Sequence, residues 1–236
     1  MKISVIVPAH NEQSFISEGL SCIKNASQLT EHEVEIVVVL NRCTDQTEKI
    51  AREFGAIITH EDSKNLSLIR NAGVHASSGD VIVTVDADSQ LHPHFLRIII
   101  EKLNQNYIGG GTLIFPERWS LGIILSASTL IPYALKYRVS AGAFWTTRES
   151  FEAIGGFNPE YVTIEDVDFA LRLKAYGKTK QKKWGTAWTA PLITSCRKFD
   201  QFGDWHLIRD RKFLKKVFSG KDQEVANQYW YDQRPS

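Results

Sequence analysis

Two aspartates, Asp86 and Asp88, stand at the end of a strongly apolar run. Residues 81–85 are all β-branched and predict a buried strand, and ligands bind at the carboxyl ends of strands in open α/β sheets. Carboxylate oxygens suit a hard divalent cation that also binds phosphate. The alternative is a polar turn, since Asp favours turns. The position at a strand end, between two other carboxylate-bearing segments, favours the ligand site. We therefore expect Asp86 and Asp88 to hold Mn²⁺ or Mg²⁺ with a diphosphate.

Two further polar segments follow predicted strands in the first half of the chain. Residues 8–12 read Pro-Ala-His-Asn-Glu, and a ligand there would meet backbone N–H groups and the positive end of a helix. Glu12 can accept a hydrogen bond from a sugar or a base, but simple capping by Asn11 and Glu12 also explains the segment. Asn41 offers amide groups suited to a nucleobase edge. Both segments are candidates for binding a nucleotide.

Arg70 lies on a helix predicted over residues 66–76, ahead of the strand that ends at the two aspartates. A guanidinium there can pair with a phosphate or with one of the aspartates. A solvated surface arginine is the alternative interpretation, and the sequence leaves both open.

Three carboxylates, Glu165, Asp166 and Asp168, open a helix predicted over residues 164–176. They suit the helix dipole, but three are more than capping needs. The apolar residues that follow predict which side of the helix is buried, and this leaves Glu165 and Asp166 facing a cleft. Asp168 is turned about 200° from Asp166 and faces elsewhere. A carboxylate beside a metal–diphosphate site can act as general base toward a hydroxyl.

The tail of the chain is rich in aromatic residues, among them Phe199, Phe202 and Trp205. Ordinary packing is the simpler interpretation for Phe199 and Phe202. A further hypothesis is that the tail folds over the bound diphosphate compound and that His206 supplies a third metal ligand.

Composition bounds the class of protein. The 236 residues carry a net charge of +1, with 43% hydrophobic and 23% charged residues, as in a soluble globular domain. No global positive field favours nucleic acid as a partner. Three cysteines without metal-site spacing, Cys22, Cys43 and Cys196, favour reduced thiols in the cytoplasm.

One apolar segment, residues 119–135, stands out after the middle of the chain. It is interrupted by polar residues and is shorter than the roughly 20 residues of a spanning helix. We expect a buried helix. A membrane-surface helix over 119–138, flanked by Arg118, Lys136 and Arg138, is the alternative.

Strands and helices alternate through the first half, which implies parallel pairing with right-handed crossovers. We expect one α/β domain over 1–236, with a nucleotide-binding half over about 1–100 and an acceptor half plus tail over about 101–236. The expected strands are 3–7, 35–40, 56–60, 81–85, 107–115 and 141–146, and the expected helices are 11–24, 44–54, 66–76, 93–103, 148–154 and 164–176.

Several short motifs occur in a specific order: residues 4–12 around Pro-Ala-His-Asn-Glu, 37–47 after the second strand, Arg-Asn-Ala-Gly at 70–73, Gly-Asp at 79–80, Asp-Ala-Asp at 86–88, Gly-Gly-Phe at 155–157 and Glu-Asp-Val-Asp at 165–168. Each motif is loose, but the ordered set resembles a family 2 glycosyltransferase from residue 3 to about 178. The resemblance implies a GT-A fold, a Rossmann-like, mostly parallel mixed sheet flanked by helices.

The resemblance also implies roles for residues. Asp166 is the base of an inverting transfer, and Asp86 and Asp88 hold the ribose and the divalent metal on the diphosphate. The substrate-binding residues that it implies are Pro8, Ala9, His10, Glu12, Asn41, Arg70, Asp86, Ala87, Asp88 and Glu165. The family often has Asp-Asp-Gly-Ser after the second strand, where this chain has Leu-Asn-Arg-Cys at 40–43, so the donor nucleotide is left open.

We therefore expect metal-dependent transfer of a sugar from a nucleoside diphosphate sugar to a sugar, lipid-linked or small-molecule acceptor. This activity fits cell envelope polysaccharide biosynthesis at the inner face of the membrane. The Gln-x-x-Arg-Trp motif of processive synthases is missing, which favours single transfer. A sugar nucleotidyltransferase would need a Gly-rich basic loop after the first strand, which residues 8–12 do not provide. A non-catalytic carbohydrate-binding protein is the remaining alternative.

Overall fold

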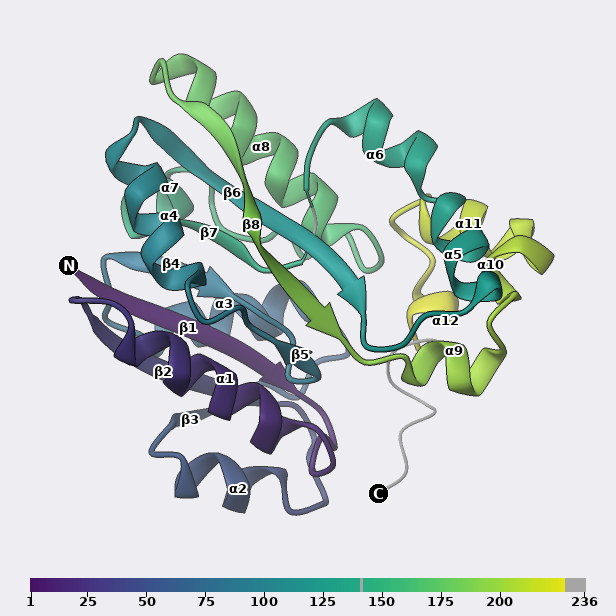
Figure 1. The fold of residues 1–236 in the computed structure, drawn as a ribbon, viewed down its shortest axis with the longest axis horizontal. Coiled ribbons are helices and arrows are strands. Elements are labelled where there is room, and N and C mark those ends of the chain that lie inside the picture. The colour runs from purple at the N-terminus through teal and green to yellow at the C-terminus, as the bar shows by residue number, and fades with distance from the viewer. Residues whose placement is uncertain (141, 228–236) are drawn as a thin grey trace.

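A computed structural model describes residues 1–140 and 142–227 (Figure 1). Eight strands form one sheet in the order β3-β2-β1-β4-β7-β6-β8-β5. The strands are β1 Lys2–Ala9, β2 Glu33–Leu40, β3 Ile57–His60, β4 Val81–Thr84, β5 Ser89–Gln90, β6 Tyr107–Pro116, β7 Phe144–Thr147 and β8 Lys183–Thr194. The helices are α1 Ile16–Gln28, α2 Thr47–Glu53, α3 Leu66–His75, α4 Phe95–Asn104, α5 Leu121–Ser128, α6 Ile131–Tyr137, α7 Arg148–Ala153, α8 Glu165–Thr179, α9 Arg197–Phe202, α10 His206–Arg209, α11 Arg211–Val217 and α12 Gln223–Ala226.

The sheet is mixed, with parallel pairing throughout its first half. β1, β2, β3 and β4 pair in parallel, so their carboxyl ends meet at one edge. β7 runs antiparallel between β4 and β6, and β6 pairs in parallel with β8. The expected α/β fold with a mostly parallel mixed sheet is confirmed.

Helices cover both faces of the sheet. Alternate residues of β1 point to opposite sides, with Val5 in one hydrophobic cluster and Ile6 in the other, as the two-residue period of a strand requires. The first cluster takes its helical residues from α1, α2 and α4, and the second from α3, α7 and α8. The buried positions of α1, Ile16, Leu20 and Ile23, recur at helical spacing and form its sheet-facing side.

Two glycines allow helices to approach the sheet closely. A Cβ at Gly73 would lie 2.3 Å from Cγ2 of Ile6, so the glycine lets α3 lie directly on β1. A Cβ at Gly19 would lie 2.8 Å from the carbonyl oxygen of Ala87, so α1 rests on the loop between the two aspartates. These contacts fix the loop and the helix that carries Arg70.

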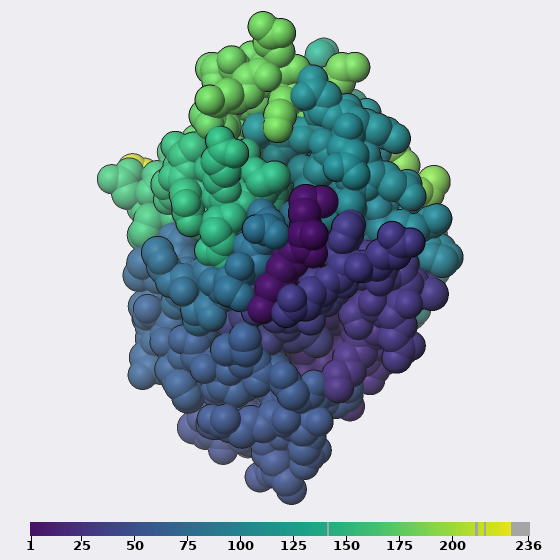
Figure 2. Space-filling view, turned by 90° about the vertical axis from the view of Figure 1, so that its left-hand side faces the viewer, coloured from purple at the N-terminus to yellow at the C-terminus, as the bar shows by residue number. Residues whose placement is uncertain are grey.

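Figure 2 shows the amino-terminal end of the parallel strands, where the first residues reach the surface between the two halves of the chain. Lys2 Nζ pairs with Glu35 at 2.8 Å, and the Lys2 N–H donates to Asp80. Burial raises the pKa of Glu35, but hydrogen bonds from Lys2, Ser4 and Ser78 outweigh it and hold that pKa at about 2. The Gly-Asp motif at 79–80 therefore contacts the start of β1, away from the ligand edge.

Some predicted boundaries were wrong. α1 begins at Ile16, because Asn11 adopts a left-handed conformation and its side-chain oxygen accepts from the N–H of Thr44 instead of capping. α8 continues through Gly177 to Thr179. The short β5 and the long β8 were not predicted at all.

The apolar segment 119–135 is not a buried helix. It forms α5 and α6, which gather with α9–α12 at one end of the sheet (Figure 1). Trp119, Leu121 and Leu135 are 61%, 65% and 70% exposed. The sequence shows that the segment is apolar but not which neighbours would cover it. Within residues 1–140 and 142–227, no helix is both long and apolar enough to cross a membrane.

Candidate active site

A pocket of about 140 Å³ opens at the carboxyl end of β4. It brings together three segments that are far apart in the sequence: the start of α3, the loop after β4 and the start of α8. Its lining residues are Leu66, Arg70, Asp86, Val162, Thr163, Glu165 and Asp166. Four predicted site residues therefore share one cavity.

Arg70 is the central cation of this pocket. It is buried and donates to Glu165 Oε1 at 2.8 Å and to Asp86 Oδ1 at 3.1 Å. Its guanidinium lies 5.2 Å from the ring centroid of Phe157, which stacks on Phe169. Arg70 is therefore not a solvated surface arginine. The sequence left pairing with a phosphate or with an aspartate open, and the structure shows the pair with Asp86.

The Gly-Gly-Phe motif at 155–157 positions the Phe157 ring against the guanidinium of Arg70. Asn71, its neighbour on α3, exchanges hydrogen bonds with the backbone of Phe157, at 2.8 and 2.9 Å. Gly156 has a φ of +65°, and a Cβ there would lie 2.7 Å from the Asn71 amide oxygen. The motif therefore fixes the aromatic ring beneath the guanidinium.

The two adjacent carboxylates of α8 differ in accessibility. Both line the pocket, but Glu165 is buried and bound to Arg70, whereas Asp166 is half-buried. Burial raises the pKa of Glu165 to about 7, with Arg70 opposing and Asp166 adding to the rise. Burial raises the pKa of Asp166 as well. Because three carboxylates face one guanidinium, Glu165 tends to retain its proton near neutral pH.

Asp168 points away from the pocket. Its Oδ2 accepts from Nε of Arg172 at 2.7 Å, one turn along α8. Arg172 also donates to the carbonyl of Ile154. The helical rotation that separates Asp168 from Asp166 in the sequence analysis is confirmed.

Asp88 lies in a second polar cluster beside the pocket. Its Oδ2 accepts from Arg197 at 2.9 Å and from the Ser195 hydroxyl at 2.8 Å. Arg197 also donates to Glu12 at 2.6 Å. Sequence analysis missed Ser195 and Arg197, because both follow β8, a strand that was not predicted.

The segment after β1 lies as expected at the ligand edge. Pro8 and Ala9 end β1 and are buried. The Nδ1 atom of His10 lies 2.6 Å from the carbonyl oxygen of Asn41, and the N–H of Glu12 donates to the Thr47 hydroxyl. The ends of β1 and β2 are therefore joined at this edge.

The Asn41 side chain is not placed to read a base. It is buried, and its amide nitrogen donates to the carbonyls of Glu61 and Ser63, while its amide oxygen accepts from Arg42. Asn41 instead holds the loop after β3 against the end of β2. We correct its predicted role from direct contact with a base to positioning of this loop.

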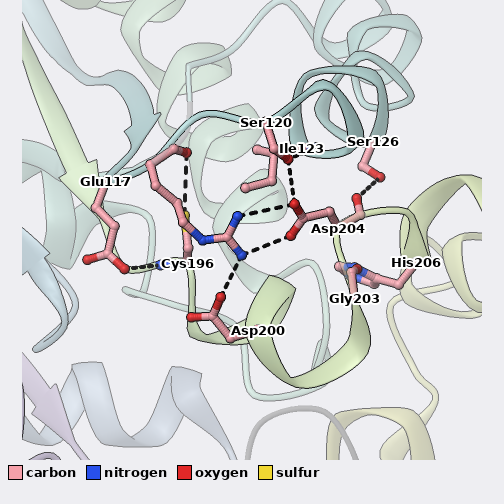
Figure 3. A network of polar contacts seen from close by, with 10 residues as sticks. Glu117, Ser120, Ile123, Ser126, Cys196, Asp200, Gly203, Asp204 and His206 are labelled. Atoms are coloured by element: carbon pink, nitrogen blue, oxygen red, sulfur yellow. Dashed lines mark hydrogen bonds and ion pairs between the residues drawn. The ribbon is translucent and has the colours of Figure 1, made fainter.

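His206 lies among the helices of the tail. Its ring packs on Phe199 and Phe202, and Nδ1 lies 2.9 Å from the carbonyl oxygen of Gly203. Figure 3 shows the neighbouring network, in which Arg118 pairs with Asp200 and Asp204. This network ties the loop after β6 to α9 and to the turn between α9 and α10.

The two aspartates of the Asp-Ala-Asp motif can be assessed as ligands of a divalent cation. Asp86, 55% exposed at its side chain, and Asp88 supply the oxygen ligands that Mn²⁺ or Mg²⁺ prefers. A cation on Asp88 Oδ2 would meet the guanidinium of Arg197, so this oxygen would be open to a cation only if Arg197 turned away. In the described part of the chain no three His, Cys, Asp or Glu side chains form a metal-binding group, and His206 as third ligand stays a prediction.

Curated relatives match over much of the chain. It is 28% identical over 215 residues to a dolichol-phosphate mannosyltransferase of Pyrococcus furiosus, covering 77% of this chain and 60% of that protein. It is 31% identical over 121 residues to an undecaprenyl-phosphate 4-deoxy-4-formamido-L-arabinose transferase of Pseudomonas fluorescens, covering 47% and 35%. The chain thus spans less than two thirds of either relative.

Solved structures share the fold. S. aureus TarS aligns with a TM-score of 0.64 at 16% identity, covering 97% of this chain and 69% of that one. Glucosyl-3-phosphoglycerate synthase of Mycobacterium tuberculosis, solved with Mn²⁺, UDP and phosphoglyceric acid, aligns with a TM-score of 0.61 at 20% identity, covering 92% and 77%. The model of the family described as glycosyl transferase family 2 matches residues 4–155, well over half of the chain. The protein belongs to this family, and it has the GT-A fold.

Proposed function

We propose that the protein transfers a single sugar, with inversion, from a nucleoside diphosphate sugar to an acceptor hydroxyl. The observation that carries the proposal is the pocket in which Arg70 joins Asp86 to Glu165 while Asp166 lines the wall. It places a half-buried carboxylate beside the Asp-Ala-Asp loop. The M. tuberculosis synthase with Mn²⁺ and UDP bound supports a nucleotide donor by likeness of fold.

In this proposal each group has one task. Residues 8–12 border the nucleotide, and Arg70 fixes Asp86 and Glu165. Asp166 takes the acceptor proton as the hydroxyl oxygen attacks the anomeric carbon, and the bond from that carbon to the diphosphate oxygen breaks. When bound by Asp86 and Asp88, Mn²⁺ or Mg²⁺ would offset the charge of the leaving diphosphate.

A panel of nucleotide sugars tests the donor class. UDP-, GDP- and dTDP-sugars, each with Mn²⁺ or Mg²⁺, are added in a thermal-shift assay. At a hundredfold excess over Kd, the matching donor stabilises by about 2.7 kcal/mol, which for this chain length raises Tm by about 5–10 °C. Asp88→Asn should lose the cation-dependent part of the shift while remaining folded. A panel without any shift would refute the nucleotide donor and favour a non-catalytic carbohydrate-binding protein.

We also propose a lipid-linked acceptor reached by peripheral contact with the cytoplasmic face of a membrane. The exposed apolar residues of 119–135 support this, and Lys136 and Arg138 adjoin them. Arg118, the third flanking cation, is instead paired with Asp200 and Asp204. The two curated relatives are named for phosphorylated polyprenol acceptors.

Vesicle sedimentation tests the membrane contact. We expect the protein to sediment with vesicles of phosphatidylglycerol and phosphatidylcholine. The double variant Trp119→Ala, Leu135→Ala should remain mostly in the supernatant, because two of the three most exposed apolar side chains of the segment are lost. Trp188→Ala, which removes a 67% exposed tryptophan of β8, is the matched control and should sediment as the wild type does. Equal sedimentation of all three proteins would contradict contact through 119–138.

A further inference from the structure

The carboxylate of Asp88 is held by the chain that follows β8. β5, which begins directly after Asp88, pairs antiparallel with the end of β8, and the N–H of Ser195 donates to the Asp88 carbonyl. This pairing brings the Ser195 hydroxyl and the Arg197 guanidinium onto the same carboxylate oxygen, at 2.8 and 2.9 Å. The pairing of β5 with β8 therefore places the start of α9, which carries Arg197, beside Asp88.

Arg197 is also anchored on the nucleotide side. It donates to Glu12, a buried residue of the 8–12 segment, at 2.6 Å, and its guanidinium lies 5.4 Å from the ring centroid of Phe15. The side chain keeps 24% of its surface exposed, so it borders solvent at the edge where the donor is expected. A guanidinium carries five N–H donors in a planar fork that matches phosphate oxygens.

The position of Arg197 creates a competition. Asp88 is one of the two aspartates that suit a divalent cation, yet its Oδ2 already accepts from Arg197. A cation and a guanidinium on one oxygen repel each other. An incoming diphosphate would give Arg197 a third anionic partner, beside Glu12 and Asp88, and thereby release Asp88.

We propose that Arg197 is a built-in counter-ion of the donor site, and this inference rests on the proposed function. In the free protein it neutralises Asp88 and Glu12. When a nucleoside diphosphate binds, Arg197 turns to the diphosphate and leaves Asp88 to the cation. Nucleotide and cation therefore bind together far better than either binds alone.

Two titrations of Arg197→Gln test this. Mn²⁺ binding without nucleotide is followed by the electron paramagnetic resonance signal of free Mn²⁺, and binding of UDP, GDP and dTDP is measured by calorimetry in EDTA. We expect the variant to bind Mn²⁺ at least tenfold more tightly than the wild type, and the preferred nucleoside diphosphate at least tenfold more weakly. A merely structural role would weaken both, because a collapsed loop binds neither ligand.

Control variants separate charge from shape. Arg197→Lys keeps the positive charge and should bind Mn²⁺ nearly as the wild type does, whereas Arg197→Met provides a second neutral variant if Arg197→Gln does not fold. Arg52→Gln removes a charge from an exposed pair on α2 and should change neither affinity.

The outcomes separate this inference from the proposed function. Unchanged or weaker Mn²⁺ binding by the neutral variants would overturn the counter-ion, and unchanged nucleotide binding would overturn the contact with the diphosphate. A wild-type protein that binds none of the three nucleotides, with or without Mn²⁺, would contradict the proposed function and the diphosphate contact together. The Mn²⁺ titration would still decide the competition at Asp88.

Discussion

Replacing Arg70 with methionine is expected to lower the free energy of unfolding by about 3–5 kcal/mol at pH 8, because the change leaves two carboxylates without their buried cation. Methionine keeps the unbranched stem of the side chain but ends short of the guanidinium that lies over Phe157. The change removes the charge, the hydrogen bonds to Asp86 and Glu165, and the contact of the guanidinium with the Phe157 ring. Urea unfolding of wild type and variant measures the loss.

The loss of stability in Arg70→Met should be smaller at low pH than at high pH. The folded-state pKa of Glu165 is already raised to about 7, above its unfolded value of about 4.3. Such a group contributes stability below its unfolded pKa and loses that contribution as pH rises through its folded pKa. Without Arg70 the folded pKa rises further, so Arg70→Met should be less destabilising at pH 5.5 than at pH 8.

Arg52→Met is the matched control, because it breaks an exposed ion pair with Glu48 and should cost at most about 0.5 kcal/mol. A loss below 1 kcal/mol for Arg70→Met at pH 8, or an equal loss at both pH values, would show that Arg70 does not neutralise the pocket.

The first half of the fold was predictable because its signals are local. The β-branched strands 3–7, 35–40 and 81–85 are each buried on both faces, and their polar ends had to meet at one edge of a parallel sheet. Helical geometry alone separated Asp166 from Asp168. The charged pocket residues on α3, after β4 and on α8 could thus be named from the sequence.

The rest depended on contacts between distant residues. β8 contains Gly185 and Pro191 and exposes Trp188, so it lacks the apolar pattern of a buried strand. Because β8 was not predicted, the sequence did not reveal the contact between Arg197 and Asp88. Asn41 has a side chain suited to a base, but the loop after β3 takes its hydrogen bonds, and no local signal reveals this.

The role of Asp166 carries the largest expected effect on activity. It lines the pocket and is more accessible than Glu165, which is tied to Arg70. Loss of a general base typically slows a reaction by about 10²–10⁴. Asp166→Asn keeps the size of the side chain but cannot take the acceptor proton, so it should lower kcat by about this factor and leave donor affinity nearly unchanged.

Two neighbouring variants serve as controls for position. Asp168→Asn alters a carboxylate that pairs with Arg172 outside the pocket and should retain near-normal turnover. Glu165→Gln weakens the contact with Arg70 and should raise the donor KM while reducing kcat less than Asp166→Asn does.

The central claim, that this pocket is the site of sugar transfer with Asp166 as its base, is tested most directly by measuring turnover and donor titration on the same four proteins: wild type, Asp166→Asn, Glu165→Gln and Asp168→Asn. Turnover is followed as release of the nucleoside diphosphate from the preferred donor. We predict that Asp166→Asn binds the donor like the wild type and turns it over about 10²–10⁴ times more slowly. Near-normal turnover by Asp166→Asn, with loss of turnover in Glu165→Gln, would contradict the assignment of the base.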